Sequence, residues 1–257
     1  MDATTFADLP TLLTGDAVAD AERPLLTYCD DATGERVELT ATELGRWAAR
    51  TAGLLHTGCG LGVGSRAAVL LPPHWQTAAV LLGAWSAGVT VSFRPTATAG
   101  LPAVGLGEDE PFDVVFVTPR RIDDWLDHVP EAEHRFVLGL APGAVPLAEV
   151  PTGYRDYLAE VRHHSGELPG YAPLTRTGAA TVDGTSYRQW GALAREIAGL
   201  RDLRAGDRVL VDAAEHEHPL KWLLAPLSVG ATVVLCANLD PAGVTARATA
   251  EQATRVL

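Results

Sequence analysis

The sequence is poor in lysine and carries little positive charge. Lys221 is the only lysine among the 20 basic residues, so chemistry that needs an ammonium group must use Lys221 or a second chain. The formal net charge is −12, whereas proteins that coat nucleic acid or dock on acidic membranes need clustered cations. We therefore expect no nucleic-acid partner.

Paired cysteines and long apolar runs are also lacking. Cys29, Cys59 and Cys236 lie far apart and form no CxxC pair, which predicts buried or half-buried thiols in a reducing cytoplasm rather than a zinc or dithiol site. The segment Met1–Pro10 lacks the basic and apolar regions of a signal peptide. The most apolar stretch, residues 77–91, is too short to span a bilayer. These features predict a cytoplasmic protein without a membrane partner.

Short apolar runs alternate with amphipathic segments, a pattern typical of α/β proteins. Leu25–Cys29 and Arg36–Leu39 flank a turn-forming segment and predict a β-hairpin. Thr40 and Glu43 have the spacing of a capping box, so a helix is expected to begin there. A βαβ unit follows, with a strand at 66–71, a helix at 74–87 and a strand at 89–93.

The same pattern returns 142 residues later. Gly64, Arg66 and Gly88 match Gly206, Arg208 and Gly230 without a gap. The match predicts two similar βαβ-containing halves, about 20–140 and 174–257, although chance likeness of two glycine-rich units remains the alternative. Strands are further expected at 113–117, 135–138, 208–212 and 231–236, and helices at 120–127, 154–161, 187–199, 216–229 and 241–257.

The stretch from Leu39 to Pro95 contains the turn Gly62-Val63-Gly64-Ser65-Arg66, and the stretch from Leu203 to Leu235 contains "AGDRVLV" and "VGATVVL". In order and spacing these segments resemble the N-terminal domain of the adenylate-forming superfamily, which includes the acyl-CoA synthetases. The resemblance implies an α/β fold with mainly parallel sheets covered by helices. It also implies that residues 1–257 are a single adenylation-type N-terminal domain without the C-terminal lid domain.

Family members carry a Ser/Thr/Gly-rich loop with a lysine that wraps the phosphates of ATP. The matching window here is 174–187, which has no lysine and places Asp183 where a phosphate would lie. Arg176 is the substitute cation, although its planar fork differs from an ammonium group. The residues that could remain from a nucleotide-binding loop are Thr175, Arg176, Thr177, Gly178, Gly184, Thr185 and Ser186.

His216 and His218 alternate with Glu215 and Glu217. On a strand the two histidines would share a face and could bind a metal, but a solvent-facing loop explains the same pattern, and we expect no metal site. The resemblance implies that a histidine near this point gates a ligand pocket, which makes both histidines pocket candidates. No catalytic residue is assigned.

The leading hypothesis is a catalytically incomplete acyl-CoA synthetase-like protein that binds an acyl or aryl small molecule or a protein partner and requires no cofactor. The alternative is a split adenylate-forming ligase, which would use ATP and magnesium once a partner chain supplies the C-terminal domain. A third hypothesis is a purely structural subunit.

Overall fold

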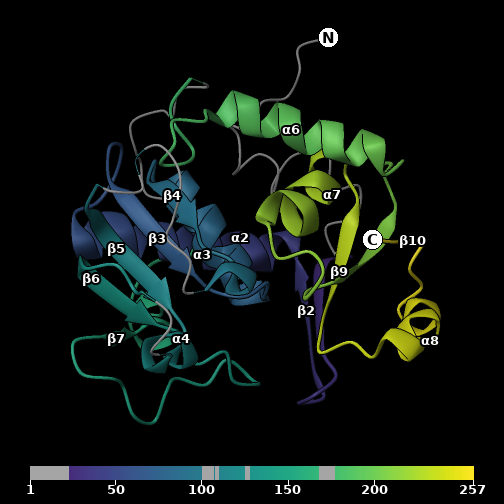
Figure 1. The fold of residues 1–257 in the computed structure, drawn as a ribbon, viewed down its shortest axis with the longest axis horizontal. Helices are drawn as coiled ribbons and strands as arrows, with labels where there is room; N and C mark the ends of the chain where they lie inside the picture. The colour runs from purple at the N-terminus through teal and green to yellow at the C-terminus, as the bar shows by residue number, and fades with distance from the viewer. Residues whose placement is uncertain (1–22, 100–106, 108–109, 125–127, 168–176) are drawn as a thin grey trace. The chain divides into compact units, whose positions relative to one another are not determined.

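The computed structural model describes residues 23–99, 107, 110–124, 128–167 and 177–257 (Figure 1). Its contacts divide the chain into two compact units. Of the described residues, the first contains those in 23–45, 73–78 and 188–257, and the second contains those in 46–72 and 79–187. The units therefore do not coincide with the sequence halves, because the hairpin near the N-terminus joins the C-terminal part of the chain.

A five-stranded parallel sheet forms the centre of the second unit. Its strand order is β4-β3-β5-β6-β7, so the chain crosses over between strands rather than turning back on itself. Val114–Val117 of β5 are fully buried, as expected for a strand covered on both faces. The strands are β3 (Arg66–Leu70), β4 (Thr90–Phe93), β5 (Phe112–Val117), β6 (Ala132–Val137) and β7 (Arg155–Asp156).

The first unit contains a second five-stranded sheet, with the order β10-β8-β9-β1-β2. Only the β1–β2 hairpin is antiparallel, and β1 pairs with β9 in parallel although about 200 residues separate them. The two sheets confirm the predicted α/β class. The strands are β1 (Pro24–Asp30), β2 (Glu35–Thr40), β8 (Arg208–Asp212), β9 (Thr232–Ala237) and β10 (Arg255–Val256).

The hairpin leads into a helix that begins with the predicted capping box. The backbone N–H of Thr40 donates to Glu43 Oε2 at 2.9 Å, and the N–H of Glu43 donates to Thr40 Oγ1 at 3.2 Å. The helices in the described residues are α2 (Ala41–Gly53), α3 (Trp75–Ser86), α4 (Pro119–Asp123), α5 (Tyr157–Val161), α6 (Tyr187–Leu200), α7 (Ala225–Ser228) and α8 (Val244–Ala250), with π turns at Leu54–Gly58 and Leu220–Leu224 and 3₁₀ turns at Thr96–Thr98 and Pro241–Gly243.

The predicted βαβ repeat is present in the strand pairing of both units. In the second unit Arg66 is the register partner of Thr90, and in the first unit Arg208 is the register partner of Thr232. Both pairs are 24 residues apart, and all four positions agree with the 142-residue offset. Thr90 and Thr232 also make the same contact, because each donates its N–H to the carbonyl just before β3 or β8, at 2.9 and 2.8 Å.

The prediction of one helix over 241–257 is wrong. Helix α8 ends at Ala250, Gln252 takes a left-handed conformation at φ +53°, and Arg255–Val256 pair with β8 as strand β10. The helix ends there because the side chain of Glu251 binds Arg36 and Arg208, which commits the chain to the edge of the sheet.

Two other predicted helices are shorter than expected. The helix expected over 216–229 begins only at Leu220, after a turn in which the N–H of His216 bonds to the carbonyl of Asp212. Pro219 favours this late start because proline fits the beginning of a helix better than its interior. The helix expected over 120–127 is α4, Pro119–Asp123, and residues 125–127 lie outside the described part.

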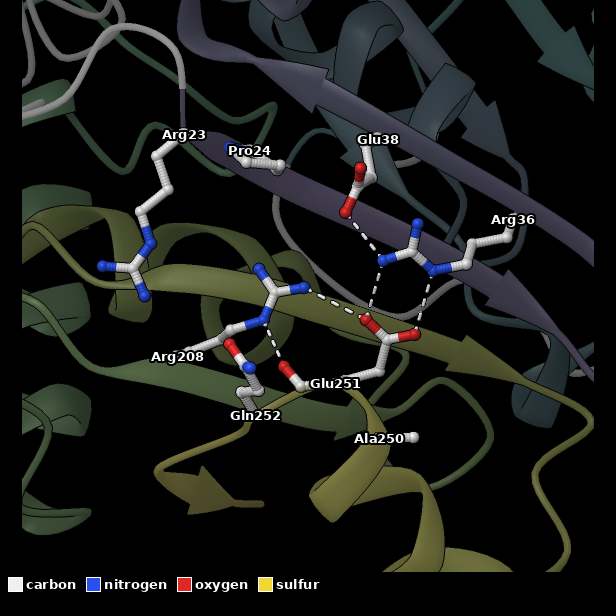
Figure 2. A pocket seen from close by; sticks show the side chains of 8 residues that line it. All are labelled: Arg23, Pro24, Arg36, Glu38, Arg208, Ala250, Glu251 and Gln252. Atoms are coloured by element: carbon white, nitrogen blue, oxygen red, sulfur yellow. Dashed lines mark hydrogen bonds and ion pairs between the residues drawn. The ribbon is translucent and has the colours of Figure 1, made fainter.

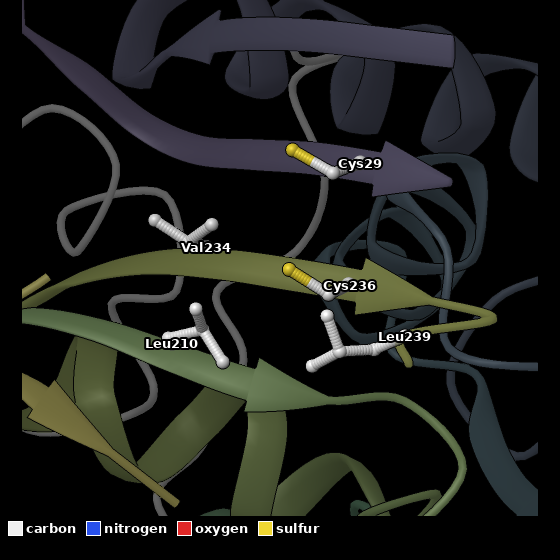
Figure 3. Close-up of a cluster of buried hydrophobic side chains, with 5 residues drawn as sticks. All are labelled: Cys29, Leu210, Val234, Cys236 and Leu239. Atoms are coloured by element: carbon white, nitrogen blue, oxygen red, sulfur yellow. The ribbon is translucent and has the colours of Figure 1, made fainter. Parts of the chain in front are cut away.

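One face of the sheet in the first unit holds a small apolar cluster (Figure 3). Its members are Cys29, Leu210, Val234, Cys236 and Leu239, and Val244 and Ala248 of helix α8 pack against it. Cys29 and Cys236 are register partners on β1 and β9. The parallel pairing of β1 with β9 thus places two cysteines from distant parts of the chain side by side.

Candidate functional site

Residues 174–187 are the segment that the sequence resemblance matches to a phosphate-binding loop. Its described part, residues 177–187, forms a closed turn. The N–H of Ala180 donates to the carbonyl of Thr185 at 2.8 Å, and that of Gly184 donates to the carbonyl of Thr181 at 3.0 Å. Tyr187 closes the base of the turn with a 3.0 Å bond to the carbonyl of Gly178. These amides therefore already have partners within the loop. Thr175 and Arg176 lie outside the described residues.

Asp183 is an exposed residue whose carboxylate bonds to this turn. Its Oδ1 accepts the hydroxyl of Thr181 at 2.6 Å and the N–H of Thr185 at 2.9 Å. Burial opposes ionisation of Asp183, but the hydrogen bonds from Thr181 and Thr185 outweigh burial and lower its pKa. A carboxylate therefore takes donors that a phosphate would need, and Ser186 takes part in a β-bridge with Ala179.

The turn is also fastened to strand β4 and helix α3 of the same unit. The N–H of Val91 donates to the carbonyl of Ala180 at 3.0 Å, and the same carbonyl accepts Trp85 Nε1 at 3.0 Å. The hydroxyl of Tyr187 donates to the carbonyl of Trp85 at 3.0 Å. The described residues of the loop thus do not fit a triphosphate, because an open cradle would require these bonds to break.

His216 lines a pocket of about 210 Å³ in the first unit. Burial lowers the pKa of His216, and the charges of Lys221 and Arg201 lower it further, so the imidazole is neutral near pH 7. Two cationic side chains therefore face an uncharged ring and an apolar wall. The residues that line the pocket are Ile197, Leu200, Arg201, His216, Lys221 and Leu257.

His218 is not among the residues that line this pocket. Its ring stacks on Trp190, with the ring centroids 5.7 Å apart and the planes 18° from parallel, and its Nδ1 accepts the N–H of Leu220 at 3.3 Å. Burial lowers the pKa of His218, and the charge of Lys221 adds to the effect. The contacts of His218 are those of a ring that fixes the start of the following helix.

Sequence reasoning did not identify the apolar wall or the place of Lys221 in the pocket. Leu193, Ile197 and Leu200 follow one another at helical spacing on α6, and Leu193 and Leu200 are 41% and 79% exposed. That spacing was visible in the sequence, but it normally indicates a buried face. Leu257 reaches the pocket because its N–H pairs with the carbonyl of Leu210, a contact that only the fold creates.

Metal and membrane features are both absent from the described residues. No group of three or more His, Cys, Asp or Glu side chains is placed to hold a metal ion in that part of the chain. None of the helices in the same residues combines the length and apolarity needed to cross a bilayer.

The fold is that of the N-terminal domain of acyl- and aryl-CoA ligases of the adenylate-forming superfamily, as the sequence resemblance predicts. A benzoate CoA ligase from Burkholderia xenovorans LB400 matches with a TM-score of 0.69 at 18% identity, over 98% of this chain and 50% of that one. The N-terminal domain of FACL13 from Mycobacterium tuberculosis matches with a TM-score of 0.66 at 16% identity, over 98% and 62%. The chain spans about half the length of the benzoate CoA ligase.

A relative found by sequence covers almost the whole chain. A TIGR03089 family protein from Mycobacterium tuberculosis (strain ATCC 25618 / H37Rv) is 38% identical over 259 residues, which covers 96% of this chain and 99% of the relative. The chain belongs to the TIGR03089 family. No family model matches it.

Proposed function

We propose that the protein is an acyl-CoA synthetase-like domain that does not adenylate an acid by itself and that binds a small acyl or aryl carboxylate. The observation that carries the proposal is the pocket at the C-terminal end of α6, where Lys221 and Arg201 accompany an apolar wall. Ile197, Leu200 and Leu257 would take the hydrocarbon part of the ligand. The two cations would pair with its carboxylate, and His216 would remain neutral beside it.

Two features support the absence of independent adenylation. The described part of residues 177–187 is closed by its own hydrogen bonds and holds the carboxylate of Asp183. Holding a triphosphate requires several backbone N–H groups and a cation that face the phosphates together. The only lysine, Lys221, lines the α6 pocket and belongs to the other unit.

Isothermal titration calorimetry tests both parts of the proposal. Benzoate and octanoate should bind the wild-type protein, whereas ATP with magnesium should give no saturable heat. Lys221→Met keeps the apolar stem and removes the charge, so it should weaken carboxylate binding about tenfold. Arg188→Gln, an exposed arginine at the start of α6, is the matched control and should bind as the wild type does.

Two results would contradict the proposal. Carboxylate binding that is unchanged in Lys221→Met would show that the ligand, if any, lies elsewhere. Steady release of pyrophosphate from ATP, magnesium and a simple acid by the purified chain alone would show that adenylation needs no further component.

A split ligase is the second candidate function, and the exposed apolar side chains of α6 favour it. Leu193 and Leu200 stand on one face of that helix, and a protein partner would cover them. Under this hypothesis a second polypeptide supplies the C-terminal domain, and ATP and magnesium act only in the complex. Carboxylate-dependent exchange of pyrophosphate into ATP should then appear when a co-purifying protein is added. Its absence with every such protein would remove this candidate.

A further inference from the structure

A second pocket in the first unit is built almost entirely from charged and polar side chains (Figure 2). It measures about 260 Å³ and lies beside strands β1, β2 and β8 and the end of helix α8. Arg23, Arg208 and Arg36 follow one another along it, and Glu38, Glu251 and Gln252 complete its polar lining. None of these residues belongs to the α6 pocket.

The two carboxylates of this arginine pocket are already paired. Glu251 accepts Arg36 Nε and Nη2, both at 3.0 Å, and Arg208 Nη2 at 3.1 Å. Glu38 accepts Arg36 Nη2 at 2.6 Å. Three guanidinium groups against two carboxylates leave one positive charge on the lining. That excess is unusual in a chain whose net charge is −12.

Hydrogen-bond donors remain after these pairs are made. Arg208 uses Nε for the carbonyl of Glu251 and Nη2 for Thr27 and Glu251, which leaves Nη1 without a bond among the described residues. Its side chain is only 8% exposed, so this nitrogen has little access to water except through the pocket. Arg36 likewise donates hydrogen bonds from Nε and Nη2 to Glu251 and Glu38, and its Nη1 makes no bond to a described residue. In Figure 2 no hydrogen bond or ion pair joins Arg23 to the other side chains that line the pocket.

We propose that the arginine pocket binds a phosphate group, held by Arg23 and the unused nitrogen of Arg208, while Arg36 at the far end of the pocket adds positive charge. Guanidinium groups suit phosphate because their planar forks match its oxygens and remain charged at any physiological pH. The donors left by Arg23, Arg208 and the amide of Gln252 exceed what the two oxygens of a carboxylate can accept. Glu251 serves as the positioning residue, since it fixes Arg36 and Arg208 by their other nitrogens.

The test is a titration followed by two-dimensional ¹H–¹⁵N NMR, at an ionic strength held constant with chloride. Inorganic phosphate should shift the amide signals of Arg36, Arg208 and Gln252 in a saturable way. Glycerol 3-phosphate is the second probe. Tighter binding of inorganic phosphate would indicate a site for the free anion, whereas tighter binding of glycerol 3-phosphate would indicate a site for a phosphorylated metabolite. Arg23→Gln should weaken binding of the better probe about tenfold while leaving the spectrum of the free protein largely unchanged.

Arg188→Gln is the matched control, because it removes an exposed arginine from α6 and should bind phosphate as the wild type does. Absence of saturation with both probes would overturn the proposal. Equal affinity of Arg23→Gln and the wild type would overturn it as well, since phosphate would then act through general screening. This site is separate from the proposed carboxylate pocket, so Lys221→Met should not alter the phosphate titration.

Discussion

At the scale of single residues, Glu251 ties the end of helix α8 to two strands. Hydrogen bonds from Arg36, with a further contribution from Arg208, lower its pKa from 4.5 to about 2 although burial opposes ionisation. Its Oε1 also lies 3.6 Å from Cys29 Sγ, and its side chain is only 6% exposed. Glu251 therefore ionises more readily in the folded protein than in the unfolded chain.

The sign of the resulting pH dependence follows from this lowered pKa. Above about pH 4.5 the carboxylate is ionised in both states and the stabilisation is complete, whereas it is lost as the pH falls from 4.5 through about 2. Glu251→Gln should lower the free energy of unfolding at pH 7 by roughly 3 kcal/mol, because it leaves two guanidinium groups without their anion. Urea denaturation between pH 2.5 and pH 7 measures both effects.

Exposed Glu149 provides the matched control for this experiment, because Glu149→Gln should leave both the stability and its slope with pH unchanged. In Glu251→Gln the loss of stability below pH 4.5 should be smaller than in the wild type. A slope in Glu251→Gln equal to that of the wild type would mean that the pKa of Glu251 is the same in the folded protein as in the unfolded chain.

At the scale of elements, the parallel pairing of β1 with β9 decides the state of two thiols. Cys29 and Cys236 are buried register partners, and the pKa of Cys236 is raised by its contact with Cys29 and by burial. Cys59 is half-buried, and burial raises its pKa although Arg155 Nη2, 3.7 Å from its Sγ, opposes the shift. The reactivity of a thiol requires access and a thiolate, and the paired cysteines lack access.

Thiol labelling should therefore distinguish the three cysteines. We expect N-ethylmaleimide to label Cys59 in the native protein, and Cys29 and Cys236 only after unfolding in urea. Mass spectrometry of peptides from native and unfolded samples measures the labelled fraction at each position. Labelling of Cys29 or Cys236 in the native protein as fast as Cys59 would mean that β1 and β9 do not stay paired.

At the scale of the whole molecule, the first unit is assembled from distant segments of the chain. Its sheet has β9 between β8 and β1, while β1 and β2 come from residues 24–40. A fragment of residues 174–257 would keep β8, β9 and β10 but lose the hairpin that covers β9. The backbone N–H and C=O groups of β9 that pair with β1 would then face solvent, and Cys236 would lose its neighbour Cys29.

This fragment should not fold cooperatively on its own. We expect a poorly dispersed NMR spectrum and a urea transition without a clear midpoint, in contrast to the full chain. Addition of a synthetic peptide that spans residues 23–45 should restore dispersion if the missing hairpin is the cause. A well-dispersed spectrum for the fragment alone would show that the repeated βαβ unit is sufficient without β1.

The parts of the fold that could be predicted are those set by short sequence patterns. The capping box at Thr40 and Glu43, the hairpin and each βαβ unit depend on residues that lie close together in sequence, and the repeat is found by comparing two such segments. The error at residues 241–257 has the opposite origin. The end of α8 depends on the pairing of Glu251 with Arg36, 215 residues away, which no periodicity reports.

The sequence alone therefore determined the class of fold, the repeated unit and the scarcity of ammonium groups. Only the tertiary structure decided that residues 177–187 close on Asp183, that His216 and Lys221 share a pocket while His218 stacks on Trp190, and that three arginines line a second pocket. The physical reason is that helical and strand periods fix which way a side chain faces. The register of distant strands fixes which other side chain it meets.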